Sequence, residues 1–216
     1  MKRIVKFGED VKGYTIPVLN EREIRAAAGL LFLFMFISIQ KAATGDFLML
    51  KYAVIIFLTD MLIRVLINPK FSPTLIIGRL IVRNQVPEYV GAQQKKFAWI
   101  IGIVLALIMF ILIVVINSFS PITGIICFIC LIFLFFESVF GICIGCLFYR
   151  WFYKEKAQYC PGEVCEISEK QEIQKTSKAQ VLIVLCFIVY IVLNIYLFND
   201  IFSEQPRYLF EISEST

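Results

Sequence analysis

Long apolar runs separated by short charged stretches dominate the chain. Three runs approach or exceed the roughly 20 apolar residues that cross a bilayer core, and two more do so if a few polar residues are tolerated. The pattern therefore predicts an all-α membrane protein, a bundle of about five transmembrane helices. The expected spans are residues 20–44, 47–67, 97–117, 122–153 and 179–198.

Local signals mark the helix ends and one unusual loop. Asn20 can cap the first helix, and Glu23 completes a start that resembles a capping box. The loop 68–96 contains SPTLIIGRLIVRN, whose apolar run is too short to cross a membrane. We expect an interfacial helix there, with Arg79 and Arg83 at the lipid headgroups. A docked amphipathic segment that binds no ligand is the simpler alternative.

Composition supports a membrane protein and narrows its chemistry. Of the 216 residues, 59% are hydrophobic, and the mean hydropathy is +0.80, more apolar than a water-soluble domain of this size. The net charge of +4 does not indicate nucleic acid as a partner. Because the chain has no histidine, imidazole metal ligands and histidine-ligated haem are excluded.

Lysine and arginine are distributed unequally between the two sides of the predicted bundle. Seventeen of them fall in the terminus and loops on one side, whereas the other side holds Lys41 and Arg207. Positive residues accumulate on the cytoplasmic side of membrane proteins. We therefore expect a cytoplasmic N-terminus and a C-terminus outside.

Six of the seven cysteines occur in close pairs: Cys127 with Cys130, Cys143 with Cys146, and Cys160 with Cys165. The last two pairs form C-x2-C-x13-C-x4-C, a spacing close to that of four-thiolate zinc sites. The same four cysteines could instead hold an iron–sulfur cluster. Packing alone is an equally good explanation for the pair at 127 and 130.

A second interpretation of the cysteines is thiol–disulfide or persulfide exchange. C-x-x-C spacing permits a disulfide, and the cationic residues after Cys146 can stabilise its thiolate. In one continuous helix, Cys127 and Cys143 would be about 24 Å apart along the axis. Exchange between these two pairs would therefore need a break near Gly141, a mobile loop, a second subunit or a carrier.

The second predicted span carries Lys51, Asp60 and Arg64, and the fourth carries Glu137. Asp60 and Arg64 are four residues apart and can pair on one helix face, although Arg64 can also extend its side chain to the interface. Glu137 has no partner nearby in sequence, and Lys51 is one candidate. Charges at bilayer depth usually mark pairing or function, so a proton-carrying role for Glu137 is one hypothesis.

Several sequence blocks resemble a bacterial membrane family catalogued as domain of unknown function number 4395. The blocks are VLNEREIRAAAG, INPKFSP, NQVPEYVGAQQKKFAW, FGICIGC and QYCPGEVC, in this order. The resemblance covers about residues 14–166 and implies the bacterial inner membrane. It also implies that the recurring cysteines of the family correspond to Cys143, Cys146, Cys160 and Cys165, and less closely to Cys127 and Cys130.

The resemblance supplies no activity but suggests a division of the chain. We expect a four-helix membrane domain at 1–166, with a cysteine-rich cytoplasmic end. A charged linker at 167–178 would lead to an additional transmembrane helix and acidic tail at 179–216.

Three functional hypotheses follow from these features. The first is membrane thiol–disulfide or sulfur handling, with a cytosolic thioredoxin-like or sulfur-carrier protein as partner. The second is a non-catalytic scaffold with a structural zinc or iron–sulfur site on the four cysteines. The third is a small transporter of a sulfur compound, whose path would be lined by Glu137 and thiols.

Overall fold

The computed structural model describes residues 7–145, 148 and 176–208, and these are mostly helical. The α-helices are Glu21–Ala43 (α1), Leu48–Leu62 (α2), Pro73–Ile81 (α3), Ala92–Met109 (α4), Pro121–Phe135 (α5) and Lys178–Ser203 (α7). Three of these helices continue as a π-helical turn: α2 as Ile63–Ile67 (η1), α4 as Phe110–Val115 (η3) and α5 as Phe136–Phe140 (η4). A 3-10 turn (η2) follows η1 at Pro69–Phe71.

Within the described residues, four helices are long and apolar enough to cross a membrane. They are Glu21–Ala43, Ala92–Val115, Pro121–Phe140 and Lys178–Ser203. The expected second span corresponds to α2 and η1, but this segment carries three charged residues and is not one of the four. The architecture fits an integral membrane protein, while the total of five spans stays a prediction.

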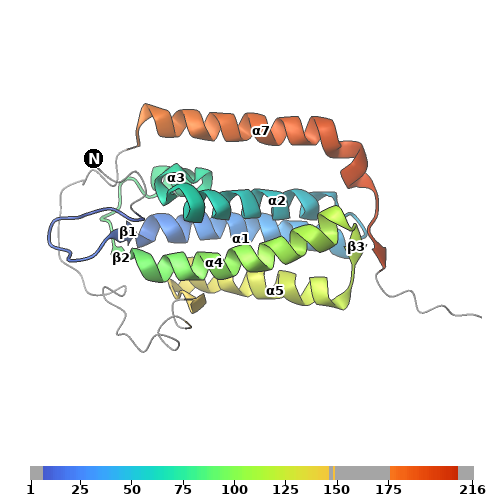
Figure 1. The fold of residues 1–216 in the computed structure, drawn as a ribbon, viewed down its shortest axis with the longest axis horizontal. Coiled ribbons are helices and arrows are strands. Elements are labelled where there is room, and N and C mark those ends of the chain that lie inside the picture. Colours follow the sequence, from blue (N-terminus) through green and yellow to red (C-terminus); the bar gives the residue numbers. More distant parts are fainter. Residues whose placement is uncertain (1–6, 146–147, 149–175, 209–216) are drawn as a thin grey trace, which may run out of the picture.

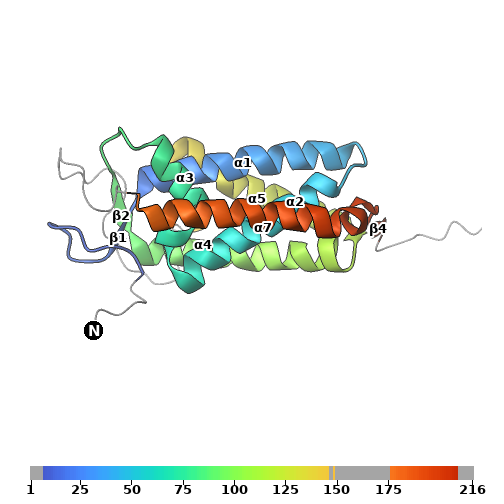
Figure 2. The ribbon, with the colours of Figure 1, turned by 90° about the horizontal axis from the view of Figure 1, so that it is seen from above.

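Helices α1, α2, α4 and α5 run side by side along the long axis of the molecule (Figure 1). Helix α1 packs on α2 and α5, and α4 also packs on α2 and α5, so the four close a ring around one apolar core. The short helix α3 packs on α1, and α7 lies over α2 and α3 on the outside of the ring (Figure 2).

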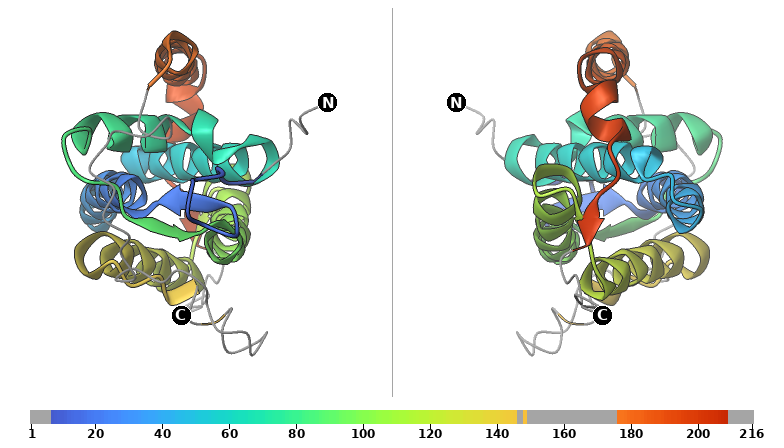
Figure 3. Two further views of the ribbon diagram at one scale, coloured as in Figure 1. Left: turned by 90° about the vertical axis from the view of Figure 1, so that its left-hand side faces the viewer. Right: turned by 90° about the vertical axis from the view of Figure 1, so that its right-hand side faces the viewer.

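Two small sheets close the opposite ends of the bundle (Figure 3). Val18–Asn20 (β1) pairs antiparallel with Tyr89–Gly91 (β2), where α1 and α4 begin. At the other end, Ser118–Phe119 (β3) pairs in parallel with Arg207–Tyr208 (β4). These pairings connect segments that are far apart in sequence, and the apolar pattern does not reveal them.

The predicted start of the first helix is confirmed. Asn20 is the N-cap of α1, and its side chain accepts a hydrogen bond from the backbone N–H of Arg22 at 3.2 Å. Its amide nitrogen also donates to Glu23 at 3.0 Å, so the two residues bond through their side chains. Because these partners are only a few residues apart, sequence alone located this helix end well.

The expectation of one helix over 122–153 is wrong at Gly141. Helix α5 and η4 end at Phe140, and Gly141 adopts a left-handed backbone conformation with φ of 66°. A left-handed glycine is a common way for a helix to end. The chain therefore turns out of the helix before Cys143. Residues 149–153 lie outside the described part of the chain, as does most of the predicted linker.

The expectation that both arginines of α3 reach the headgroups is also wrong for one of them. Arg83 is exposed, but Arg79 is buried and forms an ion pair with Glu23 of α1 at 3.1 Å. Helix α3 approaches α1 so closely that a Cβ on Gly78 would lie 2.6 Å from the carbonyl oxygen of Glu23. The absence of a side chain at Gly78 thus permits the approach that buries Arg79.

Helix α7 is attached to the bundle mainly at its two ends. At its start, the buried side chain of Gln180 accepts from Arg79 at 3.4 Å and donates to the carbonyl of Lys70 at 3.1 Å. At its end, buried Lys51 donates to the carbonyls of Phe202 and Glu204 at 3.0 and 2.7 Å. The side chains between these ends are mostly exposed and apolar, as expected for a helix that faces lipid.

We predict that Lys51→Met loosens the end of α7 without unfolding the bundle. The substitution keeps an unbranched side chain but removes two charged hydrogen bonds to carbonyls at a helix C-terminus, together worth about 2 to 5 kcal/mol. Hydrogen exchange should become faster in the last turns of α7 and stay unchanged in α1. Lys41→Met, at an exposed lysine, is the control. Unchanged exchange in α7 would mean that Lys51 does not hold it.

Candidate functional site

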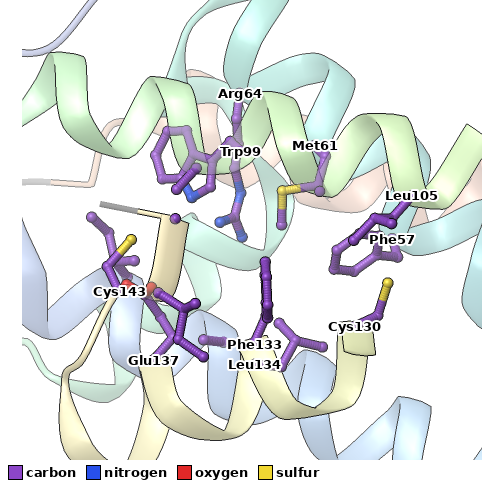
Figure 4. A pocket seen from close by; sticks show the side chains of 16 residues that line it. Phe57, Met61, Arg64, Trp99, Leu105, Cys130, Phe133, Leu134, Glu137 and Cys143 are labelled. Carbon is purple, nitrogen blue, oxygen red and sulfur yellow. The ribbon is translucent and has the colours of Figure 1, made fainter. Parts of the chain in front are cut away.

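A cavity of about 60 Å³ lies between α1, α2, α4, α5 and the segment after Gly141 (Figure 4). Most of its wall is apolar, but several chemically active side chains also line it: Arg64, Trp99, Cys130, Glu137 and Cys143. These residues come from four separate segments of the chain. The cavity therefore collects several of the residues that the sequence analysis had singled out individually.

Cys143 reaches the cavity because of the glycines on either side of it. Gly141 turns the chain, and Arg25 of α1 donates to the carbonyls of Ser138 and Val139 at 3.4 and 3.1 Å, just before that turn. On the other side, a Cβ on Gly145 would lie 2.5 Å from the Cβ of Ala98 in α4. The segment thus packs directly against α4, and Cys143 is 9% exposed.

Arg64 does not extend to the interface, so that expectation is wrong, whereas its predicted pairing with Asp60 is confirmed. The Arg64 Nε atom donates to Asp60 at 2.8 Å, and the side chains of both residues are almost completely buried. Thr74 accepts from Arg64 at 2.6 Å and donates to Asp60 at 2.7 Å. The guanidinium also lies 5.0 Å from the ring centroid of Trp99. The charge is therefore compensated inside the protein.

Glu137 pairs with Lys95 of α4, not with Lys51 as suggested from the sequence. Lys95 also donates to Glu21 of α1 at 3.0 Å, so one ammonium group joins two carboxylates. Glu21 and Lys95 are fully buried, and the side chain of Glu137 is 14% exposed where it lines the cavity. This cluster connects α1, α4 and η4 at the end of the bundle where α1 and α4 begin.

Cys127 and Cys130 of α5 are buried in the apolar core of the bundle. Cys130 lines the cavity described above, at the opposite end from Cys143 (Figure 4). Cys127 lines a different cavity, and its thiol contacts the sulfur of Met109 at 4.0 Å. The break at Gly141 thus brings Cys143 and Cys130 to one cavity without direct contact. Cys186 is exposed on α7.

The proposed four-cysteine site is only partly described. Cys146, Cys160 and Cys165 lie outside the described residues. The zinc, iron–sulfur and exchange hypotheses for the four cysteines therefore stay predictions. Among the residues that the structure does describe, no three cysteine or carboxylate side chains are grouped so as to hold a metal ion.

Sequence reasoning missed Glu21, Lys95 and Trp99 as parts of the site. In the sequence, Lys95 is one of the seventeen positive residues on one side of the bundle, and Glu21 directly follows the cap residue Asn20. One signal was present: NEREIRA places two glutamates at the start of an apolar helix, where burial would demand cationic partners. The sequence could not identify which lysine or arginine pairs with each glutamate, because the partners are more than 50 residues away.

The cavity wall brings a thiol together with charged side chains, each of which also has an ion-pair partner in the protein. Guanidinium and ammonium groups stabilise a thiolate, and a carboxylate can take up the proton that a thiol releases. Cys143 shares the cavity wall with Arg64 and Glu137, which are groups of these two kinds. Cys186, in contrast, is exposed on α7 and is not among the residues that line this cavity.

Comparison with known proteins gives one match. A family described as Domain of unknown function (DUF4395) matches residues 19–154, more than half of the chain. The match contains α1 to α5 and the whole cavity wall, and it ends before α7. No curated protein and no solved structure matches the chain.

We predict that Gly145→Ala displaces the segment that carries Cys143. The added methyl group would meet both the Cα and the Cβ of Ala98, and crowding of a packed interior costs about 1 to 3 kcal/mol. Cys143 should then react faster with a small maleimide, as followed by mass spectrometry of its peptide.

Gly124→Ala is the matched control, because a Cβ there meets no atom within 4 Å. An unchanged rate at Cys143 in a folded Gly145→Ala protein would contradict the role given to this contact.

Proposed function

The chain belongs to the DUF4395 family, and we propose that it is a membrane protein that exchanges thiols and disulfides at one end of its helical bundle. The exchanging residues are Cys143 and Cys146, together with Cys160 and Cys165. The observation that carries the proposal is the burial of Cys143 in a cavity that Arg64 and Glu137 also line.

The burial of Cys143 assigns different roles to the two members of its pair. A thiol that is 9% exposed is poorly placed to attack a protein disulfide. Cys146 is followed in sequence by Arg150, Lys154 and Lys156, whose charges favour its thiolate. We therefore propose that Cys146 attacks and that Cys143 resolves the resulting mixed disulfide.

The exchange conserves atoms and electrons. The Cys146 thiolate attacks a disulfide between Cys160 and Cys165, and one of those two sulfurs leaves as a thiolate. The Cys143 thiol gives its proton to Glu137 or to water and displaces the second sulfur. Cys143 and Cys146 are then oxidised by two electrons, and Cys160 and Cys165 are reduced by two. The reverse direction uses the same steps.

Cys160 and Cys165 would exchange with a cytosolic thioredoxin-like protein. This assignment rests on the excess of lysine and arginine at the same end of the bundle, which favours a cytoplasmic N-terminus, and on Cys160-Pro161-Gly162, which predicts a turn. A sulfur-carrier protein could use the same thiols, by passing the outer sulfur of its persulfide to a cysteine and leaving as a thiol. Both partners are consistent with a bacterial inner-membrane location.

We predict unequal effects from single substitutions of the four cysteines by serine. Cys143→Ser should accumulate a disulfide between Cys146 and the 160/165 pair, because the resolving thiol is gone. Cys146→Ser should form no such species. Non-reducing peptide mapping of the full-length protein in detergent measures both, and Cys186→Ser is the control for the loss of an unrelated thiol.

A structural metal site would behave differently. Each of the four substitutions would then release about one zinc ion per chain and lower thermal stability to a similar extent, because a four-ligand site that lacks one thiolate binds metal much more weakly. Equal destabilisation with metal loss, and no trapped disulfide, would refute exchange in favour of the scaffold hypothesis.

A further inference from the structure

A second cavity lies at the opposite end of the bundle from Cys143. Its volume is about 470 Å³, within the range of small-molecule binding sites. The end of α1, the turn into α2, the middle of α5 and the segment after α7 all contribute to its wall. The lining is apolar and rich in aromatic rings, and among its described residues only Cys127 and Gln205 carry a hydrogen-bonding side chain.

The thiol on this wall belongs to a pair that can form a disulfide. Cys127 and Cys130 lie three residues apart on α5. Ideal helix geometry places such Cα atoms about 5 Å apart, which is within the range that disulfides span. Both thiols are buried in the bundle, so an oxidant has to reach them through an apolar environment.

We propose that this cavity binds a membrane quinone, which oxidises Cys127 and Cys130 to a disulfide. Three observations favour a quinone over other occupants. The rings of Phe47 and Phe119, with centroids 5.3 Å apart, offer an apolar aromatic surface to a flat ring. Gln205 also lines the cavity, and its side-chain amide carries N–H groups that can donate to a quinone carbonyl. A charged organic disulfide would lose its hydration in this cavity without gaining a partner of opposite charge.

The reaction is balanced between the dithiol and the quinone. The Cys127 and Cys130 thiols lose two electrons and two protons and form one S–S bond. The quinone gains the two electrons, its two oxygens take up the protons, and it leaves as the quinol. No metal or further co-reactant is needed. Of the pair, only Cys127 lines this cavity, and Cys130 lines the Cys143 cavity. The inference does not depend on the exchange proposed for Cys143, because oxidation of Cys127 and Cys130 by the quinone uses neither Cys143 nor Cys146.

The test uses the full-length protein in detergent, reduced and then freed of reductant, with decylubiquinone as the probe. We expect quinone absorbance to fall in step with the loss of thiols from the peptide that carries Cys127 and Cys130. Peptide mass should show loss of two hydrogens, not addition of the quinone. Cys127→Ser and Cys130→Ser should each abolish the reaction, whereas Cys143→Ser and Cys186→Ser should keep it.

A cavity-filling variant tests the binding site separately from the thiols. Gly124 lines the cavity, and a Cβ there meets no atom within 4 Å, so Gly124→Leu starts from open space and extends its side chain into the cavity. Oxidation should slow about tenfold or more in this variant, because a few misplaced carbon atoms weaken binding in an apolar pocket by such factors. Gly124→Ala, which fills less space, should have a smaller effect.

Three results would overturn the proposal. One is no oxidation of Cys127 and Cys130 by the quinone in the folded wild-type protein. Another is equal oxidation in Gly124→Leu, which would indicate reaction without binding in the cavity. The third is binding of a fluorescent fatty acid in the cavity while the quinone is not reduced, which would identify the site as one for a lipid acyl chain.

Discussion

A charge buried among apolar helices must have a partner, and in this molecule that requirement determines how the segments meet. Lys95 of α4 is fully buried and bonds to Glu21 of α1 and to Glu137 of η4. Removing one member of such a group leaves the others charged in a medium of low polarity, at a cost of about 3 to 5 kcal/mol. One lysine thus fixes three of the four helices of the ring to each other.

The position of Cys143 follows from this constraint. Glu137 is held by Lys95 in the last turn before Gly141, and Arg25 binds the carbonyls of that same turn. Gly141 then reverses the chain, and Gly145 brings it against α4. The segment that carries Cys143 is therefore held on both sides by contacts with other helices. The proposed exchange depends on this placement, because it turns an ordinary membrane cysteine into a buried thiol beside charged groups.

Whether a structural feature can be predicted from the sequence depends on how far apart in the chain its interacting residues lie. Asn20 starts α1 through partners within three residues, and Asp60 pairs with Arg64 one turn away, so both could be read from the sequence. The apolar runs likewise locate both ends of α1 and the start of α5 to within one residue, and α4 and α7 to within about five residues, but they miss the end of α5.

Other features could not be read because their causes are distant in sequence. The partners of Glu137 and Lys51 lie 42 and more than 150 residues away. The sequence suggests that these two residues pair with each other, because neither has a partner of opposite charge nearby in the chain, and that prediction is wrong. The sequence does not decide whether the helix ends at Gly141, because the Gly-x-x-x-Gly spacing of Gly141 and Gly145 is also common where continuous membrane helices pack closely. Contacts with Arg25 and Ala98, not the motif itself, decide between the two.

The reactivity of Cys143 in a Glu137→Met variant tests most directly whether the buried charge cluster around Lys95 positions this thiol. The substitution removes the link between η4 and Lys95 but leaves Lys95 paired with Glu21. We expect a small maleimide to modify Cys143 several-fold faster than in the wild type, while Lys96→Met, at the neighbouring lysine over Phe7, leaves the rate unchanged. An unaltered rate in folded Glu137→Met protein would contradict this, and would show that the buried charge cluster does not hold Cys143.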